Sequence, residues 1–494
     1  TLFSVLDQTV NTVSLTQGEV ADAVNPLTDV GVVVNSIAGT VTVVDLRTLK
    51  PIGNSVTVGT LPQAVAIDPG KNVAVIANSG SNDVSILPLG PIRTPQITEL
   101  SPGNTFTATG SGSLTVTVQG FGFTSGAQVR LDGTSVPTVV SSNGRQATAT
   151  VSGSLLAAPR RFSLDVMTSG GSTSNEENFT VIGAIPIGLN PIGVAIDSDL
   201  GEALVTNQGA IDSAGNCTGP GSVSVVNLSS ISVTNTFSVG TCPEGVAVLP
   251  RLGLGVIANN GSNDATVVDY VNNAVAATVP VGTSPAGVAI QPDSAATVVA
   301  NSGSNTVSEF TIGGGNVQPV TIPVDQRPFG ISIDPIDDLF AVTATTQNTV
   351  DIVNLTSHFI VGRLNNFEVP SDVAFDPITN TFLVANSLLN DLAVVDPRAF
   401  TATPIRLGIN PTAIAYNFQS GTGVTVNNAT NTLSVFNFLA TNPNSVLTIQ
   451  AGKVEAILPM GGSAEFSVAI DPLTNIAAVV DQANGRLLLI PLPR

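Results

Sequence analysis

Charge is scarce in this sequence. Asp, Glu, Lys and Arg make up 10% of its 494 residues, against about 25% in an average globular protein. Basic residues are the scarcer kind, because 16 Lys and Arg stand against 35 Asp and Glu and leave a formal net charge of −19. A nucleic-acid backbone needs a basic face, so we expect no nucleic-acid partner. The neutral surface that remains resists close association with other chains less than a heavily charged one does.

Long apolar runs and long helical periods are also missing. Val-rich runs such as GVVVNS and ATVVANS last about 5–7 residues, whereas a membrane-spanning helix needs about 20. Trp is absent, Tyr occurs twice, and 47 Gly and 32 Pro accompany abundant Val and Thr. This composition favours short strands joined by tight turns, and we expect an all-β protein that does not span a membrane.

Reactive side chains are few as well. The sequence has one histidine, His358, and two cysteines, so it contains no His/Cys cluster for zinc or iron and no recognisable catalytic triad. It lacks the GxxxxGK[ST] phosphate loop, and side chains that could serve a haem as axial ligand, such as His358 or Met167, are few. The adjacent acids, Asp337–Asp338 and Glu176–Glu177, fall in polar turns where we expect solvated charge. We therefore expect no catalytic residue, no metal and no cofactor.

Repetition is what the chain has instead. The stretches VIANSGSNDVSIL (75–87), VIANNGSNDATVV (256–268) and VVANSGSNTVSEF (298–310) read almost the same. Each follows a strand of the form P-x-G-V-A-I-D-P and precedes a strand that ends in V-G. The undisturbed spacing of about 42 residues, with four short strands in each unit, predicts β-propeller blades. The first strand of the unit recurs at nine positions: Ala23, Val65, Val194, Val246, Val288, Ile331, Val373, Ile414 and Val468.

These units resemble the YVTN-type β-propeller repeat family over nearly all of the chain outside 92–181. The stretch PAGVAIQPDSAATVVANSGSNTVSEF (285–310) carries the resemblance. It implies a propeller, which we expect to have about nine four-stranded blades, or eight if one repeat is degenerate. Propellers host many unrelated activities, so the resemblance indicates fold rather than function.

An insertion separates the second and third copies. Residues 92–181 contain LSP, GFGFTSGAQVRLDG and NFTV in order and resemble the immunoglobulin-like IPT/TIG module. We therefore expect a first propeller part at 1–91, the module at 92–181 and the remainder of the propeller at 182–494. GAIPIG (183–188) would then supply the fourth strand of the second blade.

The two ends of the chain are predicted to meet in one blade. The last copy supplies strands at 466–471, 476–481 and 486–491, and NTVSLTQG (11–18) aligns with the missing fourth strand. Pairing them would close the ring and remove open sheet edges. LFSVLD (2–7) is left over, so Leu2, Phe3, Val5 and Leu6 form either an ordered edge strand or a contact to a second subunit by β-augmentation.

The repeated ANSGSN loop invites two interpretations, a ligand or metal loop and a structural turn. A metal loop needs converging carboxylates, and each loop has at most one. Asn and Gly suit tight connections because they accept left-handed backbone, so we expect a structural turn. The same interpretation covers the Asp before Pro at Asp68, Asp334, Asp376 and Asp471. The first Asn of the loop recurs at Asn35, Asn78, Asn207, Asn259, Asn301, Asn386 and Asn427.

The two cysteines test this arrangement. Cys217 lies in an insertion of one such turn and Cys242 in the link to the next blade, and a propeller places both on one face. We expect a disulfide, with two buried free thiols as the alternative, and a disulfide indicates an oxidising compartment. The numbering begins at Thr1 without Met, so we expect a chain whose signal peptide was removed.

These features favour a non-enzymatic, extracellular or cell-surface β-propeller with a structural or adhesive role. We expect self-association, as in a filament or sheath, or binding to a surface protein or glycan. One alternative is a lactonase- or lyase-like enzyme with acids from separate blades in the central channel. Another is a monomeric propeller that binds a sugar or a peptide.

Overall fold

The computed structural model describes residues 2–3, 10–11, 17–25, 28, 30–46, 49–69, 71–90, 95–107, 112–142, 144–314, 318–406, 410–430, 432–437 and 467–492. Its regular elements are strands, apart from three short 3-10 helices, η1 (Gly153–Leu156), η2 (Pro250–Leu252) and η3 (Gln482–Asn484). The all-β prediction is therefore confirmed. The chain divides into two compact units, one holding Thr1–Gly103, Thr109–Leu155 and Phe162–Phe179 and the other Asn104–Ala108, Leu156–Arg161 and Thr180–Arg494.

The first two repeats form a pair of sheets in the first unit. The first sheet consists of β3 (Glu19–Asn25), β4 (Val30–Asn35), β5 (Thr40–Asp45), β6 (Lys50–Pro51) and β7 (Val56–Thr57). The second consists of β8 (Pro62–Asp68), β9 (Val73–Asn78) and β10 (Asp83–Pro88). Strand alternation turns Val32, Val34 and Val41 of the first sheet toward Ala74 and Ile76 of the second, and these residues form their common core.

The inserted segment forms two further sheets. One has the order β11 (Gln96–Ser101), β13 (Leu114–Phe121), β17 (Gln146–Val151) and β16 (Thr138–Val140). The other has β15 (Thr134–Ser135), β14 (Gln128–Leu131), β18 (Arg160–Met167) and β19 (Glu177–Pro186), with β12 (Asn104–Phe106) parallel to β19. Buried and accessible residues alternate along β13, β17 and β18, as they do when two sheets share one core.

Seven further sheets lie in the described part of residues 183–491, and in the first six each strand pairs with the next one in the sequence. The first four are β20 (Pro191–Asp197), β21 (Glu202–Asn207), β22 (Pro220–Asn227), β23 (Ser232–Thr241); β24 (Pro243–Leu249), β25 (Leu254–Asn259), β26 (Asp264–Asp269), β27 (Ala274–Pro280); β28 (Pro285–Ile290), β29 (Ala296–Asn301), β30 (Thr306–Thr311), β31 (Val320–Pro323); and β32 (Pro328–Asp334), β33 (Leu339–Ala344), β34 (Thr349–Asn354), β35 (Ile360–Leu364). The last three are β36 (Pro370–Asp376), β37 (Thr381–Asn386), β38 (Asp391–Asp396), β39 (Thr401–Arg406); β40 (Pro411–Asn417), β41 (Thr422–Asn427), β42 (Thr432–Asn437); and β43 (Val468–Asp471), β44 (Ile476–Asp481), β45 (Arg486–Pro491) with β19.

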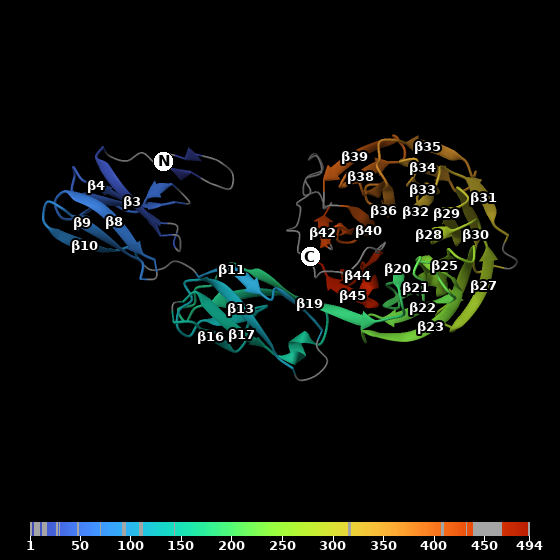
Figure 1. Ribbon diagram of the computed structural model, residues 1–494, viewed down its shortest axis with the longest axis horizontal. Helices are drawn as coiled ribbons and strands as arrows, with labels where there is room; N and C mark the ends of the chain where they lie inside the picture. Colours follow the sequence, from blue (N-terminus) through green and yellow to red (C-terminus); the bar gives the residue numbers. More distant parts are fainter. Residues whose placement is uncertain are drawn as a thin grey trace. The chain divides into compact units, whose positions relative to one another are not determined.

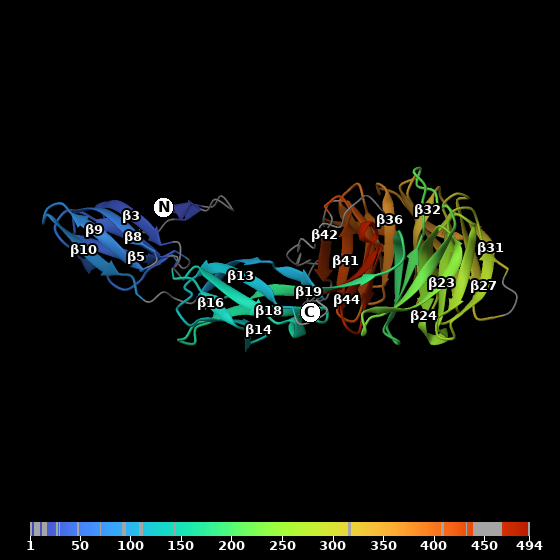
Figure 2. The ribbon, with the colours of Figure 1, turned by 60° about the horizontal axis from the view of Figure 1, so that its bottom comes forward.

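The first strand of each of these sheets is its inner strand. Each inner strand lies beside the inner strand of the following sheet, and β43 of the seventh sheet lies beside β20 of the first. Figure 1 shows the resulting propeller-like circle from β20 to β45, and Figure 2 shows the same sheets tilted. The core lies between successive sheets, as where Leu204 of β21 packs with Ile257 of β25. We call these seven sheets the ring.

The predicted closure of the ring by the two ends of the chain is wrong. One edge of β45 pairs with β44 and the other with Gly183–Pro186 of β19, so no edge of β45 is left for residues 11–18. The strand GAIPIG therefore completes the seventh sheet and not the blade of the second repeat. Of the 11–18 stretch, residues 12–16 lie outside the described part of the chain.

The predicted number of nine blades is also wrong, because seven inner strands complete the circle. The two remaining repeats, with first strands β3 and β8, form separate sheets that pack against each other in the first unit. Hence 1–91 and 182–494 are not two parts of a single ring. The repeat period correctly indicated the units, but it carries no information on which units share one circle.

Candidate ligand-binding pocket

Glycine allows the inner strands to approach one another closely. Four of them begin with Pro-x-Gly, and a Cβ on Gly245 or Gly287 would collide with the carbonyl oxygen of Ala286 or Phe329 on the next inner strand. Only glycine lacks this atom. The residue before each glycine then lines the middle of the ring, where Ile192, Glu244, Ala286 and Phe329 lie.

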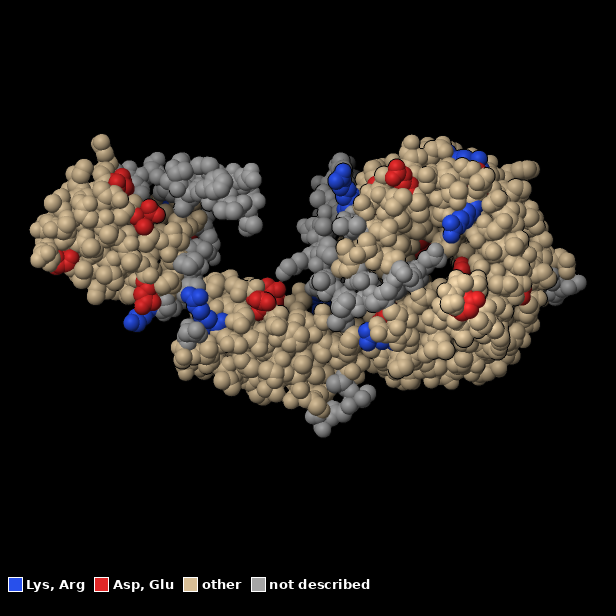
Figure 3. Space-filling view, viewed as in Figure 1, with Lys and Arg blue, Asp and Glu red and all other residues tan. Residues whose placement is uncertain are grey.

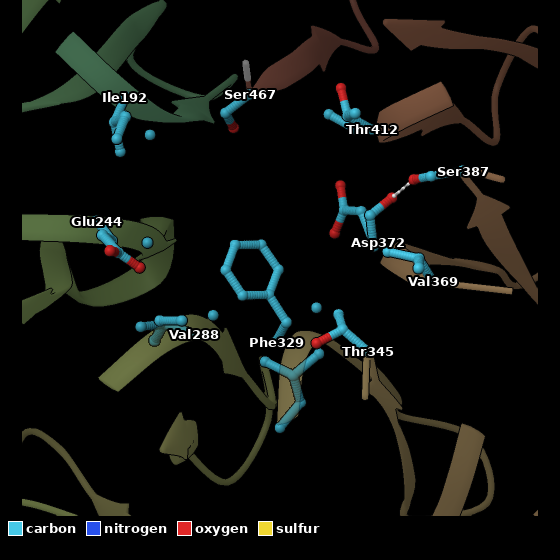
Figure 4. Close-up of a pocket in the computed structure, with 18 of the residues that line it drawn as sticks. Ile192, Glu244, Val288, Phe329, Thr345, Val369, Asp372, Ser387, Thr412 and Ser467 are labelled. Atoms are coloured by element: carbon cyan, nitrogen blue, oxygen red, sulfur yellow. Dashed lines mark hydrogen bonds between the residues drawn. The ribbon is translucent and has the colours of Figure 1, made fainter. Parts of the chain in front are cut away.

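These residues border a cavity of about 420 Å³. Figure 4 shows Glu244, Phe329 and Asp372 facing it from different inner strands. Ser387 and Thr345 border it from the turns between second and third strands. The cavity therefore opens toward the face that carries the ANSGSN turns, and its size is within the usual range for small-molecule sites.

Asp372 departs from the glycine pattern. The fifth inner strand reads Pro-Ser-Asp, so a carboxylate stands where four other inner strands have glycine. Its Oδ2 accepts a hydrogen bond from the backbone N–H of Ile414 at 2.9 Å, and Oδ1 accepts one from the N–H of Val373 at 2.9 Å. Burial raises the pKa of Asp372 to about 6, although these two hydrogen bonds act to lower it. The sequence contained this signal as a break in the P-x-G motif, but our sequence analysis did not single it out.

Hydroxyl groups complete the polar part of the cavity next to Asp372. Ser387 Oγ donates to the carbonyl oxygen of Pro411 at 2.7 Å and lies 2.9 Å from Ser371 Oγ. Figure 4 draws this contact of Ser387 as a dashed line. Together with the Phe329 ring, this wall offers one aromatic face, one carboxylate and several hydroxyls. Such a set binds a small ligand by stacking and hydrogen bonds. Among the described residues, no group of three or more His, Cys, Asp and Glu side chains is placed to hold a metal ion.

The ANSGSN turns lie at the rim and bind their own chain. The N–H groups of Asn260 and Gly261 donate to the carbonyl oxygens of Cys242 and Thr241 at 2.8 Å each, so the turn holds the link from the preceding sheet. The buried Asn259 donates from Nδ2 to Asp264 Oδ1 at 2.6 Å and to Thr266 Oγ1 at 2.8 Å. The Nδ2 group of Asn259 therefore stabilises the turn between β25 and β26.

The other copies of this asparagine make related contacts. Asn78, Asn207, Asn301, Asn386 and Asn427 each donate from Nδ2 to polar side chains of the following strand. Asn35 instead donates to the carbonyl oxygen of Gln17 and accepts from the N–H of Ala38. The second asparagine of the turn has a left-handed backbone, with φ between 56° and 59°, at Asn82, Asn263, Asn305, Asn348 and Asn390.

The Val-Gly motif at the end of the unit is explained by the same amide. A Cβ on Gly240 would come within 2.6 Å of Asn259 Cγ, and one on Gly282 would come within 2.6 Å of Asn301 Cγ. The glycine therefore leaves room for the asparagine of the next sheet. This is why V-G and A-N recur together along the chain.

The aspartates before proline accept hydrogen bonds within their turns. Asp334 Oδ1 accepts from the N–H groups of Ile336 and Asp337 at 2.8 and 3.1 Å. Asp376 and Asp471 accept from the N–H groups two residues further along, and Asp68 from that of Lys71. Asp337 forms an ion pair with Arg398 at 2.6 Å, so this member of the Asp337–Asp338 pair has a cationic partner.

Cys217 and Cys242 form the expected disulfide, with Cα atoms 5.6 Å apart. The bond ties the inserted loop between β21 and β22 to the link before β24. The loop has further internal support, because Asp212 accepts hydrogen bonds from the N–H groups of Ala214 and Asn216 at 2.9 Å each.

The remaining predicted residues lie away from this cavity. His358 follows β34, and its Nε2 lies 2.7 Å from Glu309 Oε2 of the preceding sheet. Leu2 and Phe3 form the short strand β1, which pairs with β2 (Val10–Asn11). Val5 and Leu6 lie outside the described residues. The predicted subunit contact through this segment stays a prediction.

Residues 95–181 match the IPT/TIG domain. The resemblance seen in the sequence is thereby confirmed for the inserted module. No curated protein sequence matches the chain.

Solved structures resemble the chain in fold. Hydrazine synthase of Kuenenia stuttgartiensis matches with a TM-score of 0.52 and 18% identity over 61% of this chain and 96% of the other. The β-propeller domain of Cps50 (Swd1) from Myceliophteria thermophila matches with a TM-score of 0.48 and 11% identity over 63% of this chain and all of the other. At these identities the likeness concerns the fold alone. Among the described residues, none of the helices has the length and apolar character to cross a membrane.

Proposed function

We propose that this protein is a non-enzymatic extracellular scaffold with a structural or adhesive role at a cell surface. The observation that carries the proposal is the disulfide between Cys217 and Cys242, because such bonds persist in oxidising compartments. The resemblance of the repeats to the YVTN-type family and the inserted IPT/TIG module support a scaffold built for contacts. The sparse charge on the face drawn in Figure 3 fits a surface that meets other surfaces.

The proposal is tested on protein isolated from its native source. We expect the disulfide to be fully formed there, as measured by thiol labelling before and after reduction. We also expect ordered assemblies in electron micrographs, or binding to surface proteins or glycans on arrays. A reduced Cys217–Cys242 pair in the native protein would argue against an extracellular location. Isolated particles that bind nothing on the arrays would remove the structural or adhesive role.

The cavity in the ring favours a second candidate, the binding of a small sugar or peptide. Phe329 offers a stacking face, and Asp372 with Ser387 offers hydrogen-bonding groups beside it. Screening sugars and short peptides by calorimetry tests this function. We expect any ligand found to bind at least about tenfold more weakly to Phe329→Ala, a change worth about 1.4 kcal/mol. A hit that is insensitive to this substitution would lie elsewhere.

The enzymatic alternative, a lactonase- or lyase-like activity in the channel, makes a different prediction. It requires Glu244, Asp372 or a bound metal to act on a substrate in the cavity. Metal analysis of the purified protein and turnover of lactone substrates would support it. Such turnover, lost in Asp372→Asn, would replace the non-enzymatic proposal.

A further inference from the structure

The sheet β8–β10 shares its sequence with sheets of the ring but not their surroundings. VIANSGSNDVSIL of β9 and β10 aligns with VIANNGSNDATVV of β25 and β26. In the ring, Val256 and Val267 are 0% and 3% exposed, because the following sheet packs on them. Their counterparts Val75 and Ile86 are 37% and 66% exposed. Residues that the fold buries in one place are thus accessible in another.

The accessible residues form one continuous side of the sheet. Side chains of a strand alternate between its two sides, and the residues between them, such as Ala74 and Ile76, pack against β3–β5. The outward side is apolar apart from Asp68 at the end of β8, and the exposed Asp68 forms an ion pair with Lys71 at 3.8 Å. We call it the open face, and it consists of Ala64, Ala66, Val75, Ala77, Val84 and Ile86.

The charges of the chain indicate what can cover the open face. With a net charge of −19, two copies of this chain repel each other. The repulsion is smallest when they meet through uncharged surface. The outward side of the partner sheet β3–β5 is less suitable, because Asp22 occupies the position that Val65 has in β8 and is exposed. Packing the open face on that side would bury an unpaired carboxylate, which is costly. The six residues of a second open face carry no charge, and Asp68 at their edge has Lys71 as its cationic partner.

We propose that two copies of this chain associate by packing their open faces together. The arrangement is isologous, with the same patch on both copies, and resembles the packing of two sheets in a sandwich. It rests on the proposed role as an assembling surface protein and names the surface through which the copies meet. Six small side chains form a contact below the usual size of stable interfaces. The association is therefore weak and becomes important at the high local concentration of a surface.

The first experiment is sedimentation velocity of the full chain from low micromolar to near-millimolar concentration. We expect the average mass of the wild type to rise toward that of a dimer. The double variant Val84→Glu with Ile86→Glu should weaken this association by at least about tenfold. Val139→Glu is the matched control, because Val139 lies in the inserted module and is 73% exposed. It should associate like the wild type.

A mixing experiment then identifies the partner surface. Val84→Lys with Ile86→Lys should also be monomeric by itself, and a mixture of the Lys and Glu variants should form dimers again. This rescue is expected only when the two open faces meet each other. Self-association of the Lys variant alone would indicate that its open face meets the Asp22 side of another copy, and would overturn the proposal.

The failures of this inference and of the proposed function are distinguishable. Association that persists in the Glu variant overturns the open face as the contact but leaves self-assembly intact. A wild type that stays monomeric at all concentrations overturns the inference. In that case, binding to surface proteins or glycans would still support the adhesive role.

Discussion

Asp372 is the residue at which the ring departs most clearly from its own repeat. A carboxylate replaces a glycine on the fifth inner strand and faces the cavity with a pKa raised by burial to about 6. Burial disfavours the charged form. At neutral pH the protein therefore keeps a carboxylate where its charge is costly, and this is common where a site serves binding.

This pKa gives a pH dependence of stability with a defined sign. The folded pKa of about 6 lies above the ordinary value of 3.8, so the protonated group contributes stability below pH 3.8 that is lost as the pH rises to about 6. Asp372→Asn should therefore gain up to about 3 kcal/mol relative to the wild type between pH 4 and pH 7. Thermal unfolding of both proteins at several pH values measures this. A constant difference in melting temperature would show that the carboxylate does not titrate in this range.

The repeated asparagine leads to a second prediction. In the third ring sheet, Asn301 is buried and donates to Thr306 Oγ1 and Ser308 Oγ at 3.1 and 3.0 Å. Asn301→Ala leaves these groups without their donor and should cost about 1–3 kcal/mol of unfolding free energy. Asn272→Ala, on an exposed turn, is the control and should cost clearly less. Equal losses in chemical denaturation would contradict the structural role of Asn301.

At the scale of elements, β19 closes the seventh sheet. Ile185 of this strand is 1% exposed and packs in the core between the seventh and first sheets. The sequence predicted a strand at this place but assigned it to the wrong sheet. The open edge of a sheet can form backbone hydrogen bonds with any strand of suitable pattern. Pattern alone therefore did not separate GAIPIG from NTVSLTQG as the partner of the last repeat.

A substitution in β19 tests its place in the seam. Ile185→Asp puts a charge into a buried core, so it should lower the melting temperature strongly or prevent folding. Leu189→Asp is the matched control four residues further on, because Leu189 is 68% exposed, and it should leave the melting temperature nearly unchanged. Should both variants melt like the wild type, β19 would not be part of the seam.

The strands, the inserted module and the disulfide were all predictable from short-range signals. The Asn, Gly and Val patterns specify each unit because its turn and its link contact each other within a few tens of residues. The number of units in the circle was not predictable in this way. It depends on the small rotation between successive sheets, which no residue of the repeat encodes by itself. The cavity was missed for a related reason, because it is lined by side chains from several sheets.

At the scale of the whole molecule, none of the described strands from the first 91 residues belongs to the ring. Its seven sheets draw only on β19 and on strands that follow it. A chain that begins at residue 92 should therefore keep the melting transition of the ring within a few degrees. Calorimetry of the full and shortened chains compares the two transitions. A loss of the ring transition on truncation would restore the prediction that the first two repeats complete the propeller.

The pairing of β19 with β45 also has a consequence for synthesis on the ribosome. Gly183 pairs with Leu489, so the strand that closes the circle emerges long before its partner. Until β43–β45 leave the exit tunnel, the first ring sheet lacks the seventh sheet as its neighbour and one edge of β19 is unpaired. Long-range pairing of this kind is slow and exposes strand edges. Nascent chains of this protein are therefore vulnerable to wrong pairing until β45 is made, and a premature stop before β45 would leave every copy with an open ring.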